Sequence, residues 1–306
     1  MVRAIALMRE AYSTLSAGGV EVPLRTALTN EGGTVLYKPA YSASAGIFCA
    51  KVVSVFPGNA ARGLDVTPGV LIVNDAETGM PIALAEAGYL TSLRTGAGTG
   101  VATDLFAAEN ARVGALFGTG GQAGHQLEAM LAVRSFEVIY VFSRNPANAE
   151  RFCETHEALA GTCRLVPLPE RNVLRECDVI TTATTSPTPV FSVDEISEQV
   201  HINAIGSLGK DRTEIGPETM LGSRVIVDQR AACMVEAGEI CLLRDAGRLP
   251  DGFHPVEIGE VVTRPERYPE FRAERTVFKS VGNAIQDLVC VAELLRTDSG
   301  SETLTL

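Results

Sequence analysis

The stretch Ala115-Leu-Phe-Gly-Thr-Gly-Gly-Gln-Ala-Gly124 decides the fold of this chain. An apolar run ends at Phe117, a Gly-x-Gly turn follows at once, and a helix-compatible segment continues over residues 125–133. In this order of strand, tight turn and helix, Gly118 allows the turn and Gly120 lets backbone N–H groups approach a pyrophosphate. The stretch therefore predicts the opening of a Rossmann dinucleotide-binding fold.

A second apolar run, over residues 138–142, supports this interpretation. It lies about 20 residues or slightly more beyond the first glycine, the distance expected for the second strand of this fold. A glycine motif alone also fits a turn in another kind of α/β domain. Here a strand precedes the motif, a helix follows it, and a second strand lies at the right distance, so the combined pattern favours the dinucleotide fold.

The residues that follow this second run predict the type of nucleotide. An acidic residue at this point would favour the free ribose of NAD, but the chain has Ser143-Arg144-Asn145. An arginine and small polar groups suit a 2′-phosphate, so we predict NADP(H), with NAD(H) as the alternative. In a competing interpretation Arg144 only stacks on the adenine.

Composition sets outer limits on the class of protein. The chain has 306 residues, of which 46% are hydrophobic, with a mean hydropathy of +0.15. This length allows one large domain or two of ordinary size, with a sizeable buried core. The net charge of −11 and the absence of any Lys/Arg cluster argue against nucleic acid as the main partner.

Cysteine and histidine usage points to a reduced, metal-free protein. None of the seven cysteines forms a C-x-x-C motif, and their number is odd, so we expect free thiols in a cytoplasmic protein. The four histidines lack metal-ligand spacing, and we expect no metal site. No apolar run reaches the length of a membrane span. The N-terminus is typical of an amphipathic helix rather than a signal peptide.

The first part of the chain predicts a helix followed by an antiparallel sheet. Residues 3–16 have helical periodicity. After them come runs rich in β-branched and aromatic residues, separated by Gly, Pro and Asn turns. The expected strands cover residues 25–28, 34–37, 47–56, 70–74 and 79–84.

From residue 91 onward the pattern predicts a helix over 91–106 and then alternating strands and helices, which indicates a doubly wound parallel sheet. We expect the tail from Lys279 to form a helix that packs on the first domain. The division is thus a smaller domain of residues 1–100 with 280–306, and a Rossmann domain of residues 101–279. The expected strands of the Rossmann domain cover residues 113–117, 138–142, 164–167, 179–182, 201–205 and 224–227.

The small domain supplies candidates for chemistry. Lys51 lies inside an apolar strand, Arg94 stands near the start of a helix, and Arg25 and Lys38 accompany other strands. Each of these alone fits a surface residue or a surface salt bridge. Four cations in a small, otherwise apolar domain would hold a carboxylate if they converged beside a nicotinamide, and an arginine can grip a carboxylate with two hydrogen bonds. The set therefore suggests an amino-acid or imino-acid substrate.

The chain resembles the ornithine cyclodeaminase/mu-crystallin family. The resemblance runs in order through nearly the whole chain, and compared with the family we expect the N-terminus to be short by part of a first helix. It is strongest in Leu-Thr-x-Leu-Arg-Thr and Gly-x-Gly-x-Gln-Ala. The segments that carry it are residues 51–59, 90–95, 118–123, 201–206 and 279–287.

This resemblance implies a homodimer built on the small sheet and a Rossmann domain that holds NAD(H) or NADP(H). It implies that Lys51 and Arg94 face the substrate and that Arg25 is a second carboxylate-binding arginine. Lys51 would then be the proton donor, or the electrostatic partner, at the reacting nitrogen.

Two departures from the cyclodeaminases bear on the substrate. Those enzymes carry an aspartate after the segment that matches residues 201–207, where this chain has Leu208. They also carry a Glu-x-Met-Pro motif, where this chain has Leu36-Tyr37-Lys38-Pro39. Both changes remove negative charge, and burying an unpaired ammonium group is costly. We therefore expect a pocket without acidic side chains, which favours a carboxylate substrate without a side-chain amine.

The resulting hypothesis is a reductase of a small cyclic imino acid, Δ1-pyrroline-2-carboxylate to L-proline, with the six-membered homologue also plausible. Arg25, Arg94 and Lys38 would anchor the carboxylate, and Lys51 would manage the proton on nitrogen. The alternatives are ornithine cyclodeaminase itself, an acyclic amino-acid dehydrogenase, and a non-catalytic, mu-crystallin-like protein that binds NADPH and small ligands.

Further residues are expected at the nucleotide. Gly206 and Ser207 follow a strand and would line its nicotinamide half. Asp228 would either contact the nicotinamide edge or cap the next helix, and Gly282 and Asn283 would border the active site. The full set of candidate cofactor-binding residues is Thr95, Gly118, Gly120, Gly121, Gln122, Ala123, Ser143, Arg144, Asn145, Thr182, Ala183, Gly206, Ser207, Asp228 and Gly282.

Overall fold

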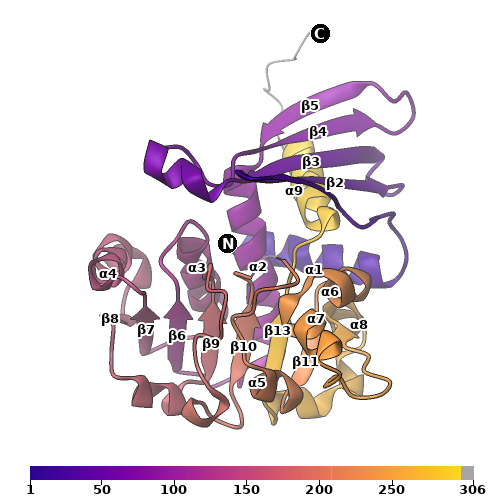
Figure 1. Ribbon diagram of the computed structural model, residues 1–306. Coiled ribbons are helices and arrows are strands. Elements are labelled where there is room, and N and C mark those ends of the chain that lie inside the picture. The colour runs from indigo at the N-terminus through magenta and orange to yellow at the C-terminus, as the bar shows by residue number, and fades with distance from the viewer. Residues whose placement is uncertain (208, 298–306) are drawn as a thin grey trace.

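The computed structural model describes residues 1–207 and 209–297 and contains two β-sheets, one above the other in Figure 1. The upper sheet has five strands in the order β1-β2-β3-β4-β5, and each neighbouring pair is antiparallel. This confirms the predicted antiparallel sheet. Its strands are Thr26–Asn30, Gly33–Ser42, Ile47–Val55, Gly69–Asp75 and Pro81–Glu86.

The lower sheet has eight strands in the order β12-β11-β13-β10-β9-β6-β7-β8, and its pairings are parallel. This confirms the predicted doubly wound sheet, and β6 to β9 and β11 have the predicted bounds. In chain order, β6 to β13 are Val113–Phe117, Val138–Phe142, Arg164–Pro167, Val179–Thr182, His201–Ala204, Arg224–Val227, Val256–Glu257 and Thr276–Lys279.

The prediction of a helix beginning at Lys279 is wrong. Lys279 ends the inner strand β13, and α9 begins only at Ala284. Between them, Gly282 has a φ of +70°, which interrupts a helix. A four-residue buried strand has too few positions to show a period of its own. The expectation of a helix between every two successive strands of this sheet is also wrong. Between β8 and β9 and between β9 and β10 the chain forms only short 3₁₀ turns, η2 (Arg171–Glu176) and η3 (Val193–Glu195).

Three helices lie between the two sheets (Figure 1): α1 (Val2–Ser16), α2 (Gly88–Phe106) and α9 (Ala284–Thr297). They share one buried apolar core with the inner face of the upper sheet and with Phe278 of β13. The predicted helices over 3–16 and 91–106 are confirmed. The expected return of the C-terminal helix is confirmed as well, because α9 packs on β2 and β3.

The helix α3 packs unusually close to α2. A Cβ on Gly96 of α2 would lie 2.4 Å from the carbonyl oxygen of His125 in α3, so the contact requires glycine. This contact holds the turn before α3 against the helix that carries Arg94.

The remaining helices are α3 (Ala123–Val133), α4 (Pro146–Ala160), α5 (Pro217–Leu221), α6 (Arg230–Glu236), α7 (Gly238–Asp245) and α8 (Ile258–Thr263), with 3₁₀ turns at Pro57–Arg62, Pro265–Arg267 and Pro269–Arg272.

Across residues 1–207 and 209–297, none of the helices combines the length and the apolar character that crossing a bilayer would require. The same residues contain no group of three or more His, Cys, Asp or Glu side chains that could hold a metal ion. All seven cysteines are free and buried.

Candidate active site

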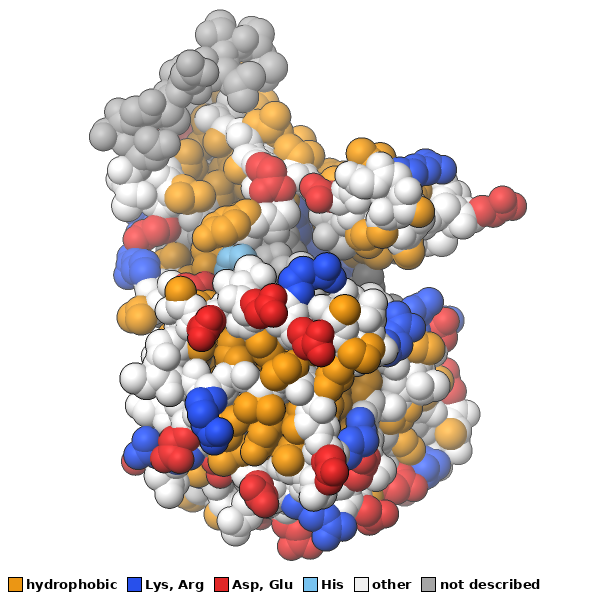
Figure 2. All heavy atoms as spheres, turned by 90° about the vertical axis from the view of Figure 1, so that its left-hand side faces the viewer, with side chains coloured by type: hydrophobic (Ala, Val, Ile, Leu, Met, Phe, Trp, Pro, Cys, Tyr) orange, Lys and Arg blue, Asp and Glu red, His pale blue; other side chains and the backbone are white. Residues whose placement is uncertain are grey.

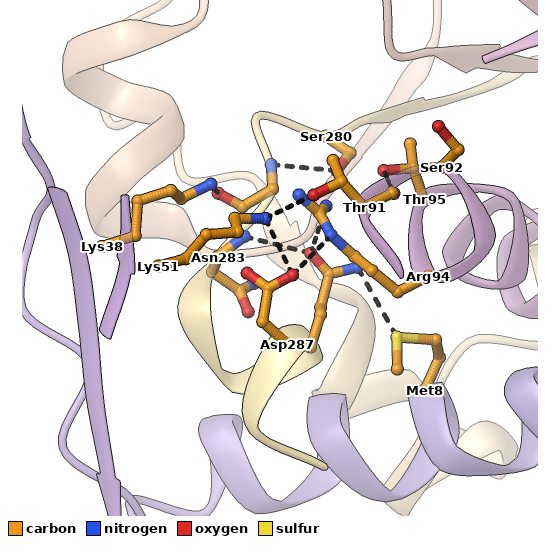
Figure 3. Close-up of polar contacts among 12 residues, drawn as sticks. Met8, Lys38, Lys51, Thr91, Ser92, Arg94, Thr95, Ser280, Asn283 and Asp287 are labelled. Carbon is orange, nitrogen blue, oxygen red and sulfur yellow. Dashed lines mark hydrogen bonds and ion pairs between the residues drawn. The ribbon is translucent and has the colours of Figure 1, made fainter. Parts of the chain in front are cut away.

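The structure brings the four predicted cations together between the two sheets, and Figure 3 shows Lys38, Lys51 and Arg94 among them. Lys38 of β2 and Lys51 of β3 stand directly opposite each other in the antiparallel register and share the buried face of the sheet. Arg94 reaches them from α2. The exposed fractions of these residues are 5%, 0% and 4%, so the cluster is closed to solvent. Arg25, just before β1, donates to the carbonyl of Val281, and Lys38 donates to the neighbouring carbonyl of Gly282 at 3.0 Å.

Asp287 is the central residue of this cluster, and the sequence-based site assignment did not include it. Its Oδ1 accepts from Lys51 Nζ at 2.8 Å and from Arg94 Nε at 3.2 Å, and its side chain is fully buried. Glu236 of α6 forms an ion pair with Arg25.

The expectation of a pocket without acidic side chains is therefore wrong. Buried cations need nearby counter-charge, because an uncompensated charge in the interior is strongly destabilising. A carboxylate within the apolar segment of α9 was the available signal. Leu208, on which part of the expectation rested, lies outside the described residues.

The environment shifts the acid–base properties of this cluster. Burial lowers the pKa of Lys51 to about 8, helped by Arg94 and opposed by Asp287. Burial also lowers the pKa of Lys38, and Lys51, Arg94 and Arg25 lower it further. Burial raises the pKa of Asp287, but Lys51, Arg94 and Lys38 outweigh that effect and lower it overall. Lys51 is thus a buried amine that titrates near neutral pH, held by an ionised carboxylate.

A groove of about 680 Å³ lies at the carboxyl ends of β6, β7 and β9. Gly118 has a φ of +103°, and a Cβ there would lie 2.3 Å from the carbonyl oxygen of Ala183. By contrast, open space surrounds the positions of a Cβ on Gly120 and Gly121. This bare backbone before α3 fits a pyrophosphate. Of the predicted cofactor residues, the groove is lined by Gly118, Gly120, Ser143, Arg144, Asn145 and Ala183.

The residues that follow β7 bring a positively charged side chain, Arg144, to the groove. Arg144 is exposed and forms no ion pair with any described residue. Asn145 lines the groove and also accepts from the backbone N–H of Ala147, which makes it the N-cap of α4. Arg171, a second cation in the groove, forms an ion pair with Glu195. No carboxylate lines the groove within the described residues.

The other predicted cofactor residues lie outside the lining of this groove. Gln122 links the glycine turn to α2, because its Nε2 donates to Ser92 Oγ at 3.2 Å. Thr95 donates to the carbonyl of Thr91, one turn back in α2. The rest of this set is Gly121, Ala123, Thr182, Gly206, Ser207, Asp228 and Gly282.

Asp228 braces the turn between β13 and α9. Its Oδ2 accepts from Ser280 Oγ at 2.8 Å and from the N–H of Gly282 at 2.7 Å, and its Oδ1 accepts from the N–H of Gln229. The side chain thus holds the loop whose carbonyls receive Arg25 and Lys38. α6 has no side-chain cap, so the capping alternative for Asp228 is wrong, and its contact with the nicotinamide stays a prediction.

Sequence reasoning also missed a buried polar network around Ser207. Its hydroxyl donates to Glu239 of α7 at 2.7 Å and accepts from Lys279 at 2.5 Å. Glu214 accepts from the backbone N–H groups of Thr184, Gly206 and Ser207. This carboxylate therefore ties together the loops after β9 and β10. Nothing in the local sequence pattern marks a glutamate in an irregular loop as buried.

The fold and the site define a class of protein: a dinucleotide-type parallel sheet, with a bare glycine turn at its edge, joined to a second sheet that encloses a cluster of cations (Figures 1 and 3). In the space-filling view of Figure 2, the molecule is hollowed between its upper and lower parts. The chain belongs to the ornithine cyclodeaminase/mu-crystallin family, whose model matches residues 1–300.

Known proteins resemble the chain over nearly its full length. It is 33% identical over 292 residues to a Delta(1)-pyrroline-2-carboxylate reductase of Bacillus cereus, covering 94% of this chain and 90% of that one. The structure of Thermococcus litoralis Delta(1)-pyrroline-2-carboxylate reductase in complex with NADH and L-proline matches with a TM-score of 0.90 and 33% identity, covering 98% and 95% of the two chains. An archaeal alanine dehydrogenase dimer with bound NAD gives a TM-score of 0.85 and 29% identity, covering 99% and 94%.

Proposed function

We propose that this protein is an NAD(P)H-dependent reductase of a small cyclic imino acid, converting Δ1-pyrroline-2-carboxylate to L-proline. The observation that carries the proposal is the closed cluster of Lys38, Lys51, Arg94 and Asp287 between the two sheets. The similarity to reductases of this imine, one of them seen with NADH and L-proline, supports it.

Charge balance explains the preference for a carboxylate substrate. Among the described residues, Arg25 pairs with Glu236, and Lys51 and Arg94 share Asp287. Lys38 has a backbone carbonyl as its hydrogen-bond acceptor and no acidic partner among the described side chains. A substrate carboxylate offers the missing negative charge, and Arg25, Arg94 and Lys38 are the groups that would receive it.

Lys51 is the group that would manage the proton on the ring nitrogen. A general acid is most effective when its pKa lies near the working pH, and the pKa of Lys51 is about 8. Asp287 and Thr91 accept from its Nζ and so fix its position. The nicotinamide, when bound, supplies the hydride for the imine carbon. Closure of the cluster excludes water from the site of proton transfer.

We also propose NADP(H) as the preferred cofactor. The glycine turn at Gly118–Gly121 would hold the pyrophosphate, and Ser143, Arg144 and Asn145 would surround a 2′-phosphate. Kinetics with both nucleotides test this choice, together with Arg144→Ala. We expect the variant to lose most of the preference for NADPH while keeping its KM for NADH. A wild-type enzyme that strongly prefers NADH contradicts the assignment.

A substrate panel tests the activity itself. We expect the purified protein to oxidise NADPH with Δ1-pyrroline-2-carboxylate, and to release no ammonia from L-ornithine at a comparable rate. Ornithine turnover at a similar rate would favour the cyclodeaminase reaction, and turnover with pyruvate and ammonia alone would favour an acyclic amino-acid dehydrogenase. Nucleotide binding without turnover on any imine would favour the non-catalytic role.

The assembly that we propose is a homodimer formed through the outer face of the five-stranded sheet. That face exposes large apolar side chains: Leu28, Tyr37, Phe48, Ile72, Ile82 and Leu84. A broad apolar face on an open sheet is typical of a protein interface.

The division into a domain of residues 1–100 with 280–306 and a domain of residues 101–279 stays a prediction, and its boundary falls inside α2. A cytoplasmic location stays a prediction as well.

A further inference from the structure

The start of α9 carries buried polar atoms that lack partners. Asn283 stands directly before this helix, and Asp287 follows one helical turn later. Both amide atoms of Asn283, Oδ1 and Nδ2, are buried without a hydrogen bond to any described residue, and so is Oδ2 of Asp287. Asn283 is 3% exposed. In Figure 3 the two residues lie side by side next to Lys51.

Such atoms are a strong signal because a buried polar group is nearly always satisfied. The backbone N–H of Asn283 donates to Gln286 Oε1 at 3.0 Å, so the residue is anchored through its backbone. Oδ1 of Asp287 already receives Lys51 and Arg94, so its other oxygen faces away from those cations. Three unpartnered atoms within one helical turn therefore favour this place for binding a polar ligand.

The chemistry of these atoms describes that ligand. Oδ1 of Asn283 and Oδ2 of Asp287 are two acceptors, and they require N–H or O–H donors. Nδ2 of Asn283 is a donor and requires an acceptor such as a carboxylate oxygen. A cyclic imino acid protonated on its ring nitrogen carries an N–H and a carboxylate on adjacent atoms. The reduced product carries the same carboxylate and two N–H bonds.

We propose that Asn283 is a specificity-determining residue whose Oδ1, beside Oδ2 of Asp287, accepts the ring N–H of the substrate while its Nδ2 donates to the substrate carboxylate. The inference rests on the proposed function and adds the group that distinguishes a ring N–H from other ring atoms. The proton on the nitrogen comes from Lys51, whose Nζ shares Asp287 as its partner.

A pair of planar analogues tests the N–H contact. Pyrrole-2-carboxylate has a ring N–H, and furan-2-carboxylate has a ring oxygen at the same place. Titration calorimetry of the enzyme–NADP⁺ complex gives both dissociation constants without turnover. For the wild type we expect pyrrole-2-carboxylate to bind about tenfold more tightly, the scale of one hydrogen bond to a charged or buried acceptor.

Two substitutions separate recognition from packing. Asn283→Leu removes the acceptor at similar size and should lower the preference for the pyrrole by about threefold or more. Asn283→Asp keeps an acceptor and should retain the wild-type preference. Thr219→Val is the matched control, because it removes another unpartnered buried polar atom in α5, and it should leave the preference unchanged.

The outcomes distinguish this inference from the function on which it rests. A wild type that reduces no cyclic imine contradicts the proposed function. A wild type that reduces the imine, with an Asn283→Leu variant that keeps the full preference, overturns the inference alone. An equal loss of preference in the Leu and Asp variants also overturns it, because a retained acceptor would then make no difference.

Discussion

At the scale of single residues, the site depends on a lysine pair that the sheet forces together. Opposite positions in an antiparallel pair bring Lys38 and Lys51 to the same face, where like charges destabilise each other. Asp287 offsets the charge of Lys51, whereas Lys38 is left with a carbonyl. This arrangement favours the binding of an anion beside Lys38.

Replacing Lys51 by methionine should abolish most of the activity while the protein stays folded. Methionine fills a similar volume in the buried strand, so the loss reflects the missing acid, and a general acid is worth about 10²–10⁴ in rate. Single-turnover reduction of the imine measures the change. A variant with more than a tenth of the wild-type rate would exclude Lys51 as the proton donor.

The pH dependence should follow the same amine. The folded-state pKa of Lys51 is about 8, so its protonated form disappears as the pH rises through that value. We expect kcat/KM for imine reduction to be level below pH 7 and to fall about tenfold per unit well above pH 8. A profile that stays flat up to pH 9.5 contradicts this expectation.

Asp287→Asn should act on both stability and titration. The substitution leaves Lys51 and Arg94 buried without a counter-charge, at a cost of about 3–5 kcal/mol in the free energy of unfolding. It also removes the group that raises the pKa of Lys51, so the falling limb of the pH profile should move to lower pH. Urea unfolding and the pH–rate profile measure the two effects. An unchanged falling limb would show that Asp287 does not influence the pKa of Lys51.

At the scale of elements, α2 connects the substrate cluster to the glycine turn. Arg94 lies on α2, Gln122 bonds to Ser92 of the same helix, and Gly96 lets α3 approach it. The first residues of α3, where a pyrophosphate would bind, are therefore placed by contact with α2, the helix that carries Arg94.

Gly96→Ala should disturb nucleotide binding from a distance. The new Cβ would collide with the backbone of His125 at 2.4 Å, and backbone cannot move aside without shifting α3. We expect a raised KM for the nucleotide and a lower midpoint of thermal unfolding. Gly58→Ala is the control, because nothing lies within 4 Å of its Cβ position. Equal KM values in the two variants would contradict this coupling.

Most elements were predictable from local patterns, because β6 and β7 are apolar runs with glycine or polar residues at their ends. β13 was not predicted because its apolar pattern continues into that of α9. The break between the strand and the helix is marked by Gly282, which has a positive φ. The cations of the site were visible as charges in a small, otherwise apolar domain, with Lys51 inside an apolar strand. Asp287 and Asn283 could be assigned to the site only from their contacts with residues far away in the sequence, and a local pattern contains no such contacts.

At the scale of the whole molecule, the two sheets present different outer surfaces. The parallel sheet is flanked by helices, whereas the outer face of the five-stranded sheet is open and apolar (Figure 1). Ile72→Lys places a charge on that face, in the middle of β4. We expect it to shift sedimentation from dimer to monomer, and Glu77→Lys in a neighbouring exposed turn to leave it unchanged. A wild type that sediments as a monomer would contradict the proposed assembly.

The order of strands in the parallel sheet has a consequence for synthesis in the cell. β13 lies between β10 and β11, and α9 fills the space between the sheets, yet both come from residues 276–297. A nascent chain that has not yet reached residue 276 lacks both elements, so β10 and β11 have no strand between them and Lys51 lacks its partner Asp287. A chain stopped at residue 275 should therefore fail to reach the native structure and be a client for chaperones and proteases.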